Sequence, residues 1–210
     1  MQLVAIKTFA LTLTAFSLLA LYIARMLDLS PSEGEARYRG VNSLPEHVQR
    51  LTERAGEFEA IARKYANFER AYFVGRCEGY GLAREGALKL KEISYIHAKA
   101  YPASELKHGP LALIDPQTPT FVIMPEDDLL TKNRSTIAEV RTRQGLVVAL
   151  GQAKEPGVEV DDYIQVPGVH PLIDPMLLLE PLQYIAYHSA LARDCDVDQP
   201  RNLAKSETVE

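Results

Sequence analysis

The sequence has few cysteines, no tryptophan and no excess of positive charge, and these shortages exclude several classes of protein. Only two of the 210 residues are cysteines, Cys77 and Cys195, which are too few and too distant in sequence for a disulfide framework or a tetrahedral metal site. Twenty-three Lys and Arg stand against 28 Asp and Glu, a net charge of −5, which gives no broad basic field for nucleic acid. We therefore expect a protein of the reducing cytoplasm with no metal and no nucleic-acid partner.

Long charge-free stretches are also scarce, and the exception lies near the N-terminus. Residues 8–24 carry no charge, and a run of this length is at the lower limit for crossing a membrane. The run has little positive charge before it, no clear cleavage site after it and several Thr and Ser within it, all of which weaken a signal-peptide interpretation. On pattern alone, a membrane or export segment and a helix buried in a globular core both stay open.

The rest of the chain alternates short apolar runs with helical periodicity, as ordinary globular proteins do. Strands are expected at residues 71–75, 119–125, 146–150 and 162–167. Helices are expected over 43–67, beginning at a capping box of Ser43 and Glu46, and over 78–96, 127–144 and 174–193, with a polar connector before the first. Because parallel strands need crossover connections, the pattern predicts an α/β fold, a three-layer α/β/α sandwich with a mostly parallel sheet.

A glycine-rich turn follows the first expected strand. Gly75, Gly79 and Gly81 lie between that strand and the next helix, where backbone amides at a helix N-terminus can attract an anion. The spacing matches neither a dinucleotide loop nor a Walker loop, so a tight strand-to-helix turn is the competing interpretation. No cofactor is expected.

The helix after this turn has charged residues in two places. At about 100° per residue, Glu85, Lys89 and Glu92 fall together at the edge of the apolar face, while Arg84 and Lys91 fall on the opposite side. One interpretation is an exposed Glu85–Lys89 pair worth about 0.3 kcal/mol. The other is a proton-transfer site, in which a half-buried carboxylate acts as base and a cation stabilises an enolate.

Two further residues have side chains suited to the same chemistry. His108 lies in a loop beside Gly109 and Pro110, and an imidazole that titrates near neutrality can shuttle protons. Lys205 lies in the polar C-terminal tail. Spacing alone does not separate a catalytic role from a surface role for either residue.

Residues 85–115 and 196–210 together resemble the C-terminal half of the sugar isomerase part of the glutamine–fructose-6-phosphate transaminase (isomerising) family, and weaker similarity begins at VAIKTFALTL near the N-terminus. The resemblance implies a second sugar isomerase (SIS) domain over 1–195, including an N-terminal core helix, and an active-site tail over 196–210. It also implies a cytoplasmic homodimer without a membrane partner.

The resemblance implies a role for each candidate residue. Glu92 would move a proton between C1 and C2 of fructose 6-phosphate, and Lys89 would stabilise the enolamine. Lys205 would form a Schiff base with the open-chain ketose. His108, supplied by the neighbouring subunit, would open the sugar ring, and Glu85 would orient that histidine. The product of the family's reaction, with ammonia from glutamine, is glucosamine 6-phosphate.

The sequence departs from the family pattern in ways that affect the expected function. We find no glutaminase domain with a cysteine nucleophile and no S-x-S-G-x-T phosphate loop, while Cys77 and Glu207 stand where Gly and Val are usual. The chain is therefore expected to be incomplete for the full reaction, with a separate or missing glutaminase and first SIS domain. The alternatives are a related aminosugar-phosphate isomerase or deaminase, or a non-catalytic sugar-phosphate-binding module.

Overall fold

The structure is a computed structural model that describes residues 6–203, of which Ile6 and Lys7 are described by backbone alone. Its helices, strands and two 3₁₀ turns follow one another in this order: α1 (Ile6–Met26), α2 (Pro31–Asn42), α3 (Leu44–Glu53), α4 (Ala55–Tyr65), β1 (Arg70–Gly75), α5 (Glu78–Ser94), β2 (His97–Pro102), η1 (Ala103–His108), η2 (Pro110–Leu113), β3 (Thr120–Ile123), α6 (Leu130–Arg141), β4 (Val147–Gly151), β5 (Asp162–Gln165) and α7 (Asp174–Ala192).

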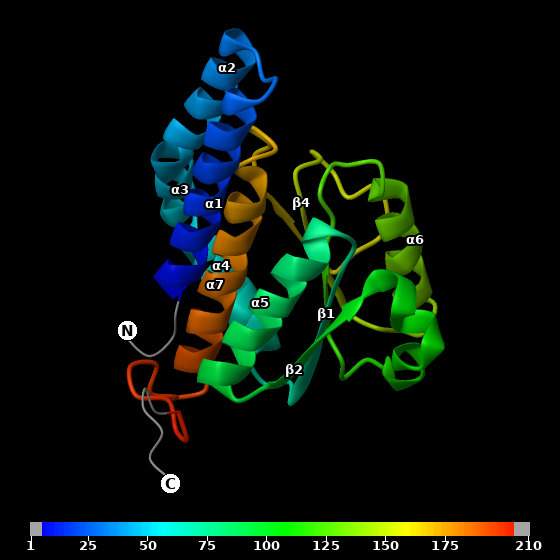
Figure 1. The fold of residues 1–210 in the computed structure, drawn as a ribbon. Helices are drawn as coiled ribbons and strands as arrows, with labels where there is room; N and C mark the ends of the chain where they lie inside the picture. Colours follow the sequence, from blue (N-terminus) through cyan, green and yellow to red (C-terminus); the bar gives the residue numbers. More distant parts are fainter. Residues whose placement is uncertain (1–5, 204–210) are drawn as a thin grey trace, which may run out of the picture.

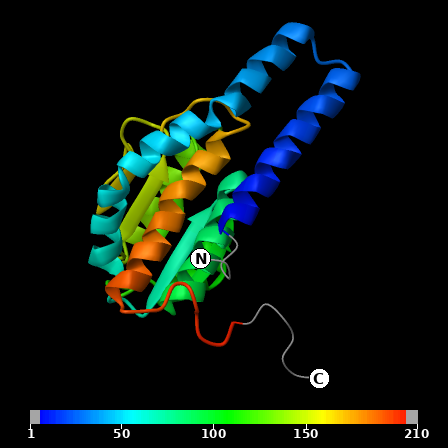
Figure 2. The ribbon, with the colours of Figure 1, turned by 90° about the vertical axis from the view of Figure 1, so that its left-hand side faces the viewer.

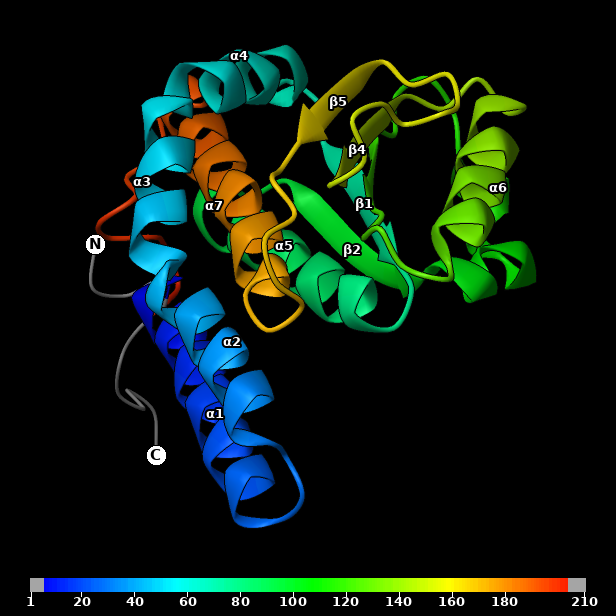
Figure 3. The same ribbon diagram turned by 90° about the horizontal axis from the view of Figure 1, so that it is seen from above.

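The five strands form one parallel sheet in the order β2-β1-β3-β4-β5, seen from above in Figure 3. The predicted parallel sheet is thus confirmed, and four of its strands lie where the apolar runs predicted them. Strand β2 was not predicted. Its sequence, HAKAYP, mixes exposed, half-buried and buried residues, because an edge strand is paired along one side only and does not need a continuous apolar run.

Helices cover both faces of the sheet, so the predicted three-layer sandwich is confirmed (Figure 1). Alternate strand residues point to opposite layers. Phe73 and Phe121, whose rings stack with centroids 4.6 Å apart, pack in the core cluster that includes α4, α5 and α7 residues. Val74 and Val122 belong to the second cluster, under α6 and the 3₁₀ turns. The three inner strands, β1, β3 and β4, are buried on both faces, as central parallel strands are.

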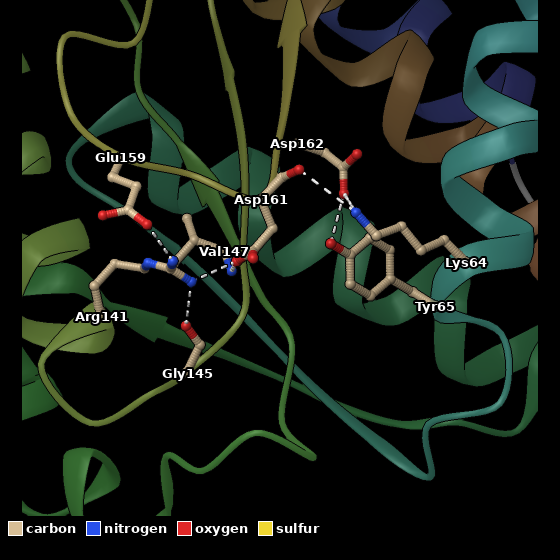
Figure 4. Close-up of polar contacts among 8 residues, drawn as sticks. All are labelled: Lys64, Tyr65, Arg141, Gly145, Val147, Glu159, Asp161 and Asp162. Carbon is tan, nitrogen blue, oxygen red and sulfur yellow. Dashed lines mark hydrogen bonds and ion pairs between the residues drawn. The ribbon is translucent and has the colours of Figure 1, made fainter.

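A group of charged residues fixes the start of β5 (Figure 4). Arg141 on α6 donates to Asp161 over 2.8 Å, while Tyr65 and Lys64 on α4 donate to Asp162 over 2.6 and 2.7 Å. Burial, together with the hydrogen bond to Asp162, raises the pKa of the Tyr65 phenol. The two aspartates therefore tie helices from both layers to the edge strand, at its amino end.

The helices before β1 differ from their predicted bounds. Residues 32–42, predicted as a connector, lie in helix α2, which begins at a capping box of Ser30 and Glu33. The predicted box at Ser43 is wrong, because the Ser43 hydroxyl donates instead to the Gly40 carbonyl and makes no cap contact. The single helix predicted over 43–67 is divided at Arg54, whose φ and ψ of −93° and 10° leave the helical region.

Helix α1 lies largely at the surface, and with α2 it forms a hairpin that projects from the sandwich (Figure 2). Among the described residues it is the one helix long and apolar enough to cross a membrane, and only 6% of its apolar window, Thr8–Met26, is buried. The predicted core helix is therefore wrong within this chain. Exposed large side chains occupy one half of the helix: Leu11, Phe16, Leu18, Leu19, Tyr22, Ile23 and Met26.

The other half of α1 explains why the pattern suggested burial. Leu21 is buried, and Phe9 and Leu13 pack against the core, while Thr14 contacts Met176 of α7. A helix that is apolar all round needs partners on every side. The described part of the chain supplies them on one side only.

Candidate functional site

The predicted charged stripe lies on α5, which packs between the sheet and α7. Gly86 lets this helix approach the sheet closely, since an added Cβ there would lie 3.0 Å from the Phe73 ring. The close packing buries the inner face of α5 and brings Glu85, Lys89 and Glu92 to the edge of the buried region. The helical periodicity therefore located these three side chains correctly.

The three side chains form a compact ion-pair group. The Lys89 ammonium lies 2.8 Å from a Glu92 oxygen and 3.5 Å from a Glu85 oxygen. The Lys89 and Glu85 side chains are 4% and 9% exposed, whereas Glu92 retains 23%. The interpretation as an exposed surface pair is therefore wrong. Glu92 is the carboxylate of the group that most readily meets a ligand from solvent.

Burial and charge act in opposite directions on Glu85. Removal from water raises the pKa of this carboxyl above its ordinary value of 4.5, and the Lys89 ammonium partly offsets the rise. Lys89 is the one cation of the group, and in a site of low dielectric a cation stabilises negative charge that develops close to it. The group is therefore suited to stabilising an enolate formed beside it.

The raised pKa of Glu85 predicts how stability depends on pH. The folded state binds a proton at Glu85 more tightly than the unfolded state does, so this residue's contribution to folding declines as pH rises from about 4.5 through the raised pKa. Glu85→Gln removes that titration. Urea unfolding between pH 4 and 7 should show the variant gaining stability relative to the parent chain as pH rises. A difference that is constant with pH, or that shrinks, contradicts the assignment.

His108 lies apart from the ion-pair group. It ends η1 and is exposed, and the following Gly109 has a φ of 143°, in the region that favours glycine. Ala103 and Leu106 of the same turn pack in the cluster on the α6 face of the sheet, opposite the layer that contains α5. Within one chain, the structure does not bring His108 to Glu92.

Lys205 lies outside the described residues, but the tail residue Arg201 contacts the end of α5. Beyond α7, the backbone N–H of Arg201 donates to the Tyr95 hydroxyl over 2.9 Å, and the Arg201 guanidinium lies 4.0 Å above the Tyr95 ring. Tyr95 directly follows α5. The C-terminal segment is thereby held at the end of the helix that carries the ion-pair group.

The glycine-rich turn leads into a separate cavity of about 560 Å³ at the carboxyl ends of the central strands. Crevices at this edge are the usual ligand sites of open parallel sheets, and the strand order that creates one is not readable from sequence. Carboxylates dominate its charged lining: Glu78, Glu126, Asp127, Asp128 and Asp174. Such a lining repels anions.

Gly75 has a steric role in the glycine-rich turn, since an added Cβ would lie 2.3 Å from the Gly79 backbone. This close approach agrees with the interpretation of the segment as a tight strand-to-helix turn.

The described part of the chain contains no cluster of side chains suited to binding a metal ion. Over residues 6–203, no group of three or more His, Cys, Asp or Glu side chains could hold an ion. Cys77 and Cys195 are both free.

Comparison with known proteins relates the chain to sugar-phosphate enzymes. A model of the SIS domain matches residues 64–164. Glutamine–fructose-6-phosphate aminotransferase (isomerizing) of Escherichia coli (strain K12) is 44% identical over 206 residues, which are 97% of this chain and 34% of that protein. The same enzyme of Idiomarina loihiensis is 44% identical over 207 residues, with the same shares. The chain thus spans about a third of the length of the curated relatives it matches.

Solved structures agree with the sequence comparisons. The C-terminal domain of glucosamine-fructose-6-phosphate aminotransferase from Francisella tularensis superposes with a TM-score of 0.81 and 36% identity, over 85% of this chain and 51% of that one. Tagatose-6-phosphate ketose/aldose isomerase from Escherichia coli gives a TM-score of 0.62 and 21% identity, over 76% and 48% of the two chains. The second likeness shows the fold alone.

Proposed function

We propose that this chain performs the ketose-to-aldose step in the formation of glucosamine 6-phosphate from fructose 6-phosphate. The proposal is supported by its likeness to the SIS domain over residues 64–164 and to the C-terminal part of the glutamine–fructose-6-phosphate aminotransferases. The observation that carries the proposal is the half-buried group on α5, where Lys89 is bound between Glu85 and Glu92. A base beside a cation in low dielectric is what proton transfer next to a carbonyl requires.

In this proposal Glu92 is the base. It removes a proton from C1 of the open-chain sugar and returns it to C2, and the Lys89 ammonium stabilises the enolamine that forms in between. The greater exposure of Glu92 supports its contact with the substrate. Lys205 forms a Schiff base with the ketose, which the anchoring of Arg201 at the end of α5 supports.

His108 opens the sugar ring in this proposal and is supplied by a second subunit, where Glu85 orients it. Its exposed position on the far side of the sheet from α5 supports a role in a neighbouring chain. The active form is accordingly a cytoplasmic homodimer. Ammonia comes from a glutaminase, and a first SIS domain contributes to sugar binding. The region of the relatives to which this chain corresponds therefore does not carry out the full reaction alone.

The proposed Schiff base can be trapped chemically. The Lys205 amine adds to the ketone of fructose 6-phosphate and loses water, and borohydride then reduces the imine to a stable secondary amine. Intact mass spectrometry should show one sugar phosphate per chain, and peptide mapping should place it on Lys205.

The matched controls are Lys205→Arg, which should abolish the adduct, and Lys132→Arg on α6, which should not. Exposed Lys132 lies outside the proposed site. An adduct spread over several surface lysines, or unchanged in Lys205→Arg, would contradict the role of Lys205.

A further inference from the structure

The tail that follows α7 is held by a series of contacts that ends at Tyr95. Helices α7 and α5 pack against each other, and their ends lie side by side where the tail begins (Figure 1). Cys195 and Val197 of the tail pack against the core cluster that includes α5 residues. The backbone N–H of Arg201 then donates to the Tyr95 hydroxyl over 2.9 Å. The tail is therefore attached to the helix that carries the ion-pair group.

Tyr95 has a backbone conformation that glycine usually provides. It ends α5 in the left-handed region, with a φ of 61° and a ψ of 12°, where the end of a helix most often has Gly or Asn. A residue with a Cβ is unfavourable there, because the Cβ comes close to the backbone. Residues held in this region against their preference cluster at functional sites. The side chain of Tyr95 is therefore the part of this residue whose role needs an explanation.

That side chain makes two different contacts with one residue of the tail. The hydroxyl accepts the hydrogen bond from the Arg201 backbone, and the ring lies 4.0 Å from the Arg201 guanidinium. A cation over an aromatic face is attracted to it. The first contact fixes the backbone of the tail and the second fixes the Arg201 side chain, so together they hold both the position and the orientation of this residue.

The anchored residue is close in sequence to the proposed nucleophile. Lys205 follows Arg201 by four residues, which span at most about 14 Å, and Tyr95 follows Glu92 by about one helical turn. Without the contact to Tyr95, the nearest tail residue packed against the core cluster is Val197, eight residues before Lys205. Doubling the length of a flexible segment lowers the effective concentration at its end by about threefold.

We propose that Tyr95 is a positioning residue, which holds Arg201 and thereby keeps the Lys205 amine close to Glu92 for attack on the ketone of fructose 6-phosphate. The inference rests on the proposed function, in which this amine adds to the carbonyl carbon and water leaves. Tyr95 touches no substrate in this account. It accelerates imine formation by reducing the volume that the amine explores.

The test is the initial rate at which borohydride traps fructose 6-phosphate on Lys205 of the full chain. Tyr95→Phe removes the hydroxyl and keeps the ring, and it should slow trapping by about 2- to 3-fold. Tyr95→Gly removes both contacts, while Gly adopts the left-handed backbone readily, so α5 should still end at this residue. This variant should slow trapping by about 3- to 10-fold.

Hydrogen exchange separates positioning from a merely structural role. In both variants the amides of residues 196–203 should exchange faster, while those of α5 exchange as in the parent chain. The matched control is Tyr184→Phe, which removes a phenol hydroxyl that contacts Thr52 over 3.1 Å, between α7 and α3. It should be trapped at the parent rate. If Tyr95→Gly unfolds, Tyr95→Phe decides the case, because it keeps the ring and its packing.

The outcomes distinguish this inference from the proposed function. Trapping of both Tyr95 variants at the parent rate would contradict the positioning role alone, as would a slower rate accompanied by faster exchange throughout α5. Absence of a Lys205 adduct in the parent chain would contradict the proposed function and the positioning role with it. In that case, unchanged exchange of residues 196–203 in Tyr95→Gly would also show that Tyr95 does not hold the tail.

Discussion

Glu92→Gln is expected to slow isomerisation of fructose 6-phosphate by about 10²–10⁴-fold, in the parent chain or in a chain completed by the remaining domains. Gln keeps the shape of the side chain and can still contact Lys89, but it cannot accept the proton from C1. Because Glu92 is 23% exposed and does not shape the core, the substitution should change sugar affinity and stability little. A fall in kcat at nearly constant KM is the expected kinetic result.

Glu46→Gln is the matched control for this substitution. Glu46 also pairs with a cation on its own helix, Arg50 at 2.6 Å, but both side chains are more than half exposed. This variant should isomerise at the parent rate. Equal rates for Glu92→Gln and Glu46→Gln would remove the catalytic assignment, because proton transfer would then not need this carboxylate.

Lys89→Met should have the largest effect on stability, a loss of about 3–5 kcal/mol in the free energy of unfolding. Met fills a similar volume and packs well, yet it leaves Glu85 and Glu92 without the ammonium that lies 3.5 and 2.8 Å from them. Removing one member of a buried ion-pair group costs far more than the group itself contributes. Urea unfolding followed by circular dichroism measures the difference.

Lys64→Met serves as the control because its ion pair with Asp162 is as short, 2.7 Å, while half of the Lys64 side chain is exposed. It should lose less than about 1 kcal/mol. A second variant, Lys89→Met/Glu85→Gln, should recover part of the loss by removing one uncompensated charge. If Lys89→Met and Lys64→Met are equally mild, the group on α5 is not buried as described.

The hydrophobic periodicity of the sequence predicted the structure correctly wherever one helix or strand buries one continuous face. It predicted the three strands that are buried on both faces, β1, β3 and β4, and also the edge strand β5. It placed Glu85, Lys89 and Glu92 together because their angular positions on a helix follow from their numbers alone. It failed where burial depends on distant partners. The apolar pattern of α1 is compatible with complete burial, but the described chain covers only one side of it.

Relations between elements were the part that could not be predicted from the residues. Strand order places the η1 turn of His108 on the opposite layer from α5, and nothing in local sequence encodes that separation. A cleft beside α5 is lined by Lys99 as well as by residues of that helix, and Lys99 lies on β2, the strand that the apolar pattern missed. Arg84 and Lys91 were correctly placed on the exposed side of the helix.

Proton exchange at C1 of fructose 6-phosphate in D₂O tests the central claim most directly. The chain is incubated with the sugar phosphate, and deuterium at C1 is followed by NMR, which requires no ammonia and no glutaminase. The account predicts incorporation of one deuterium on one face of C1, faster than in buffer alone and lost in Glu92→Gln. Exchange no faster than in buffer, at concentrations where the chain binds fructose 6-phosphate, would contradict it and leave a sugar-phosphate-binding module without catalytic function.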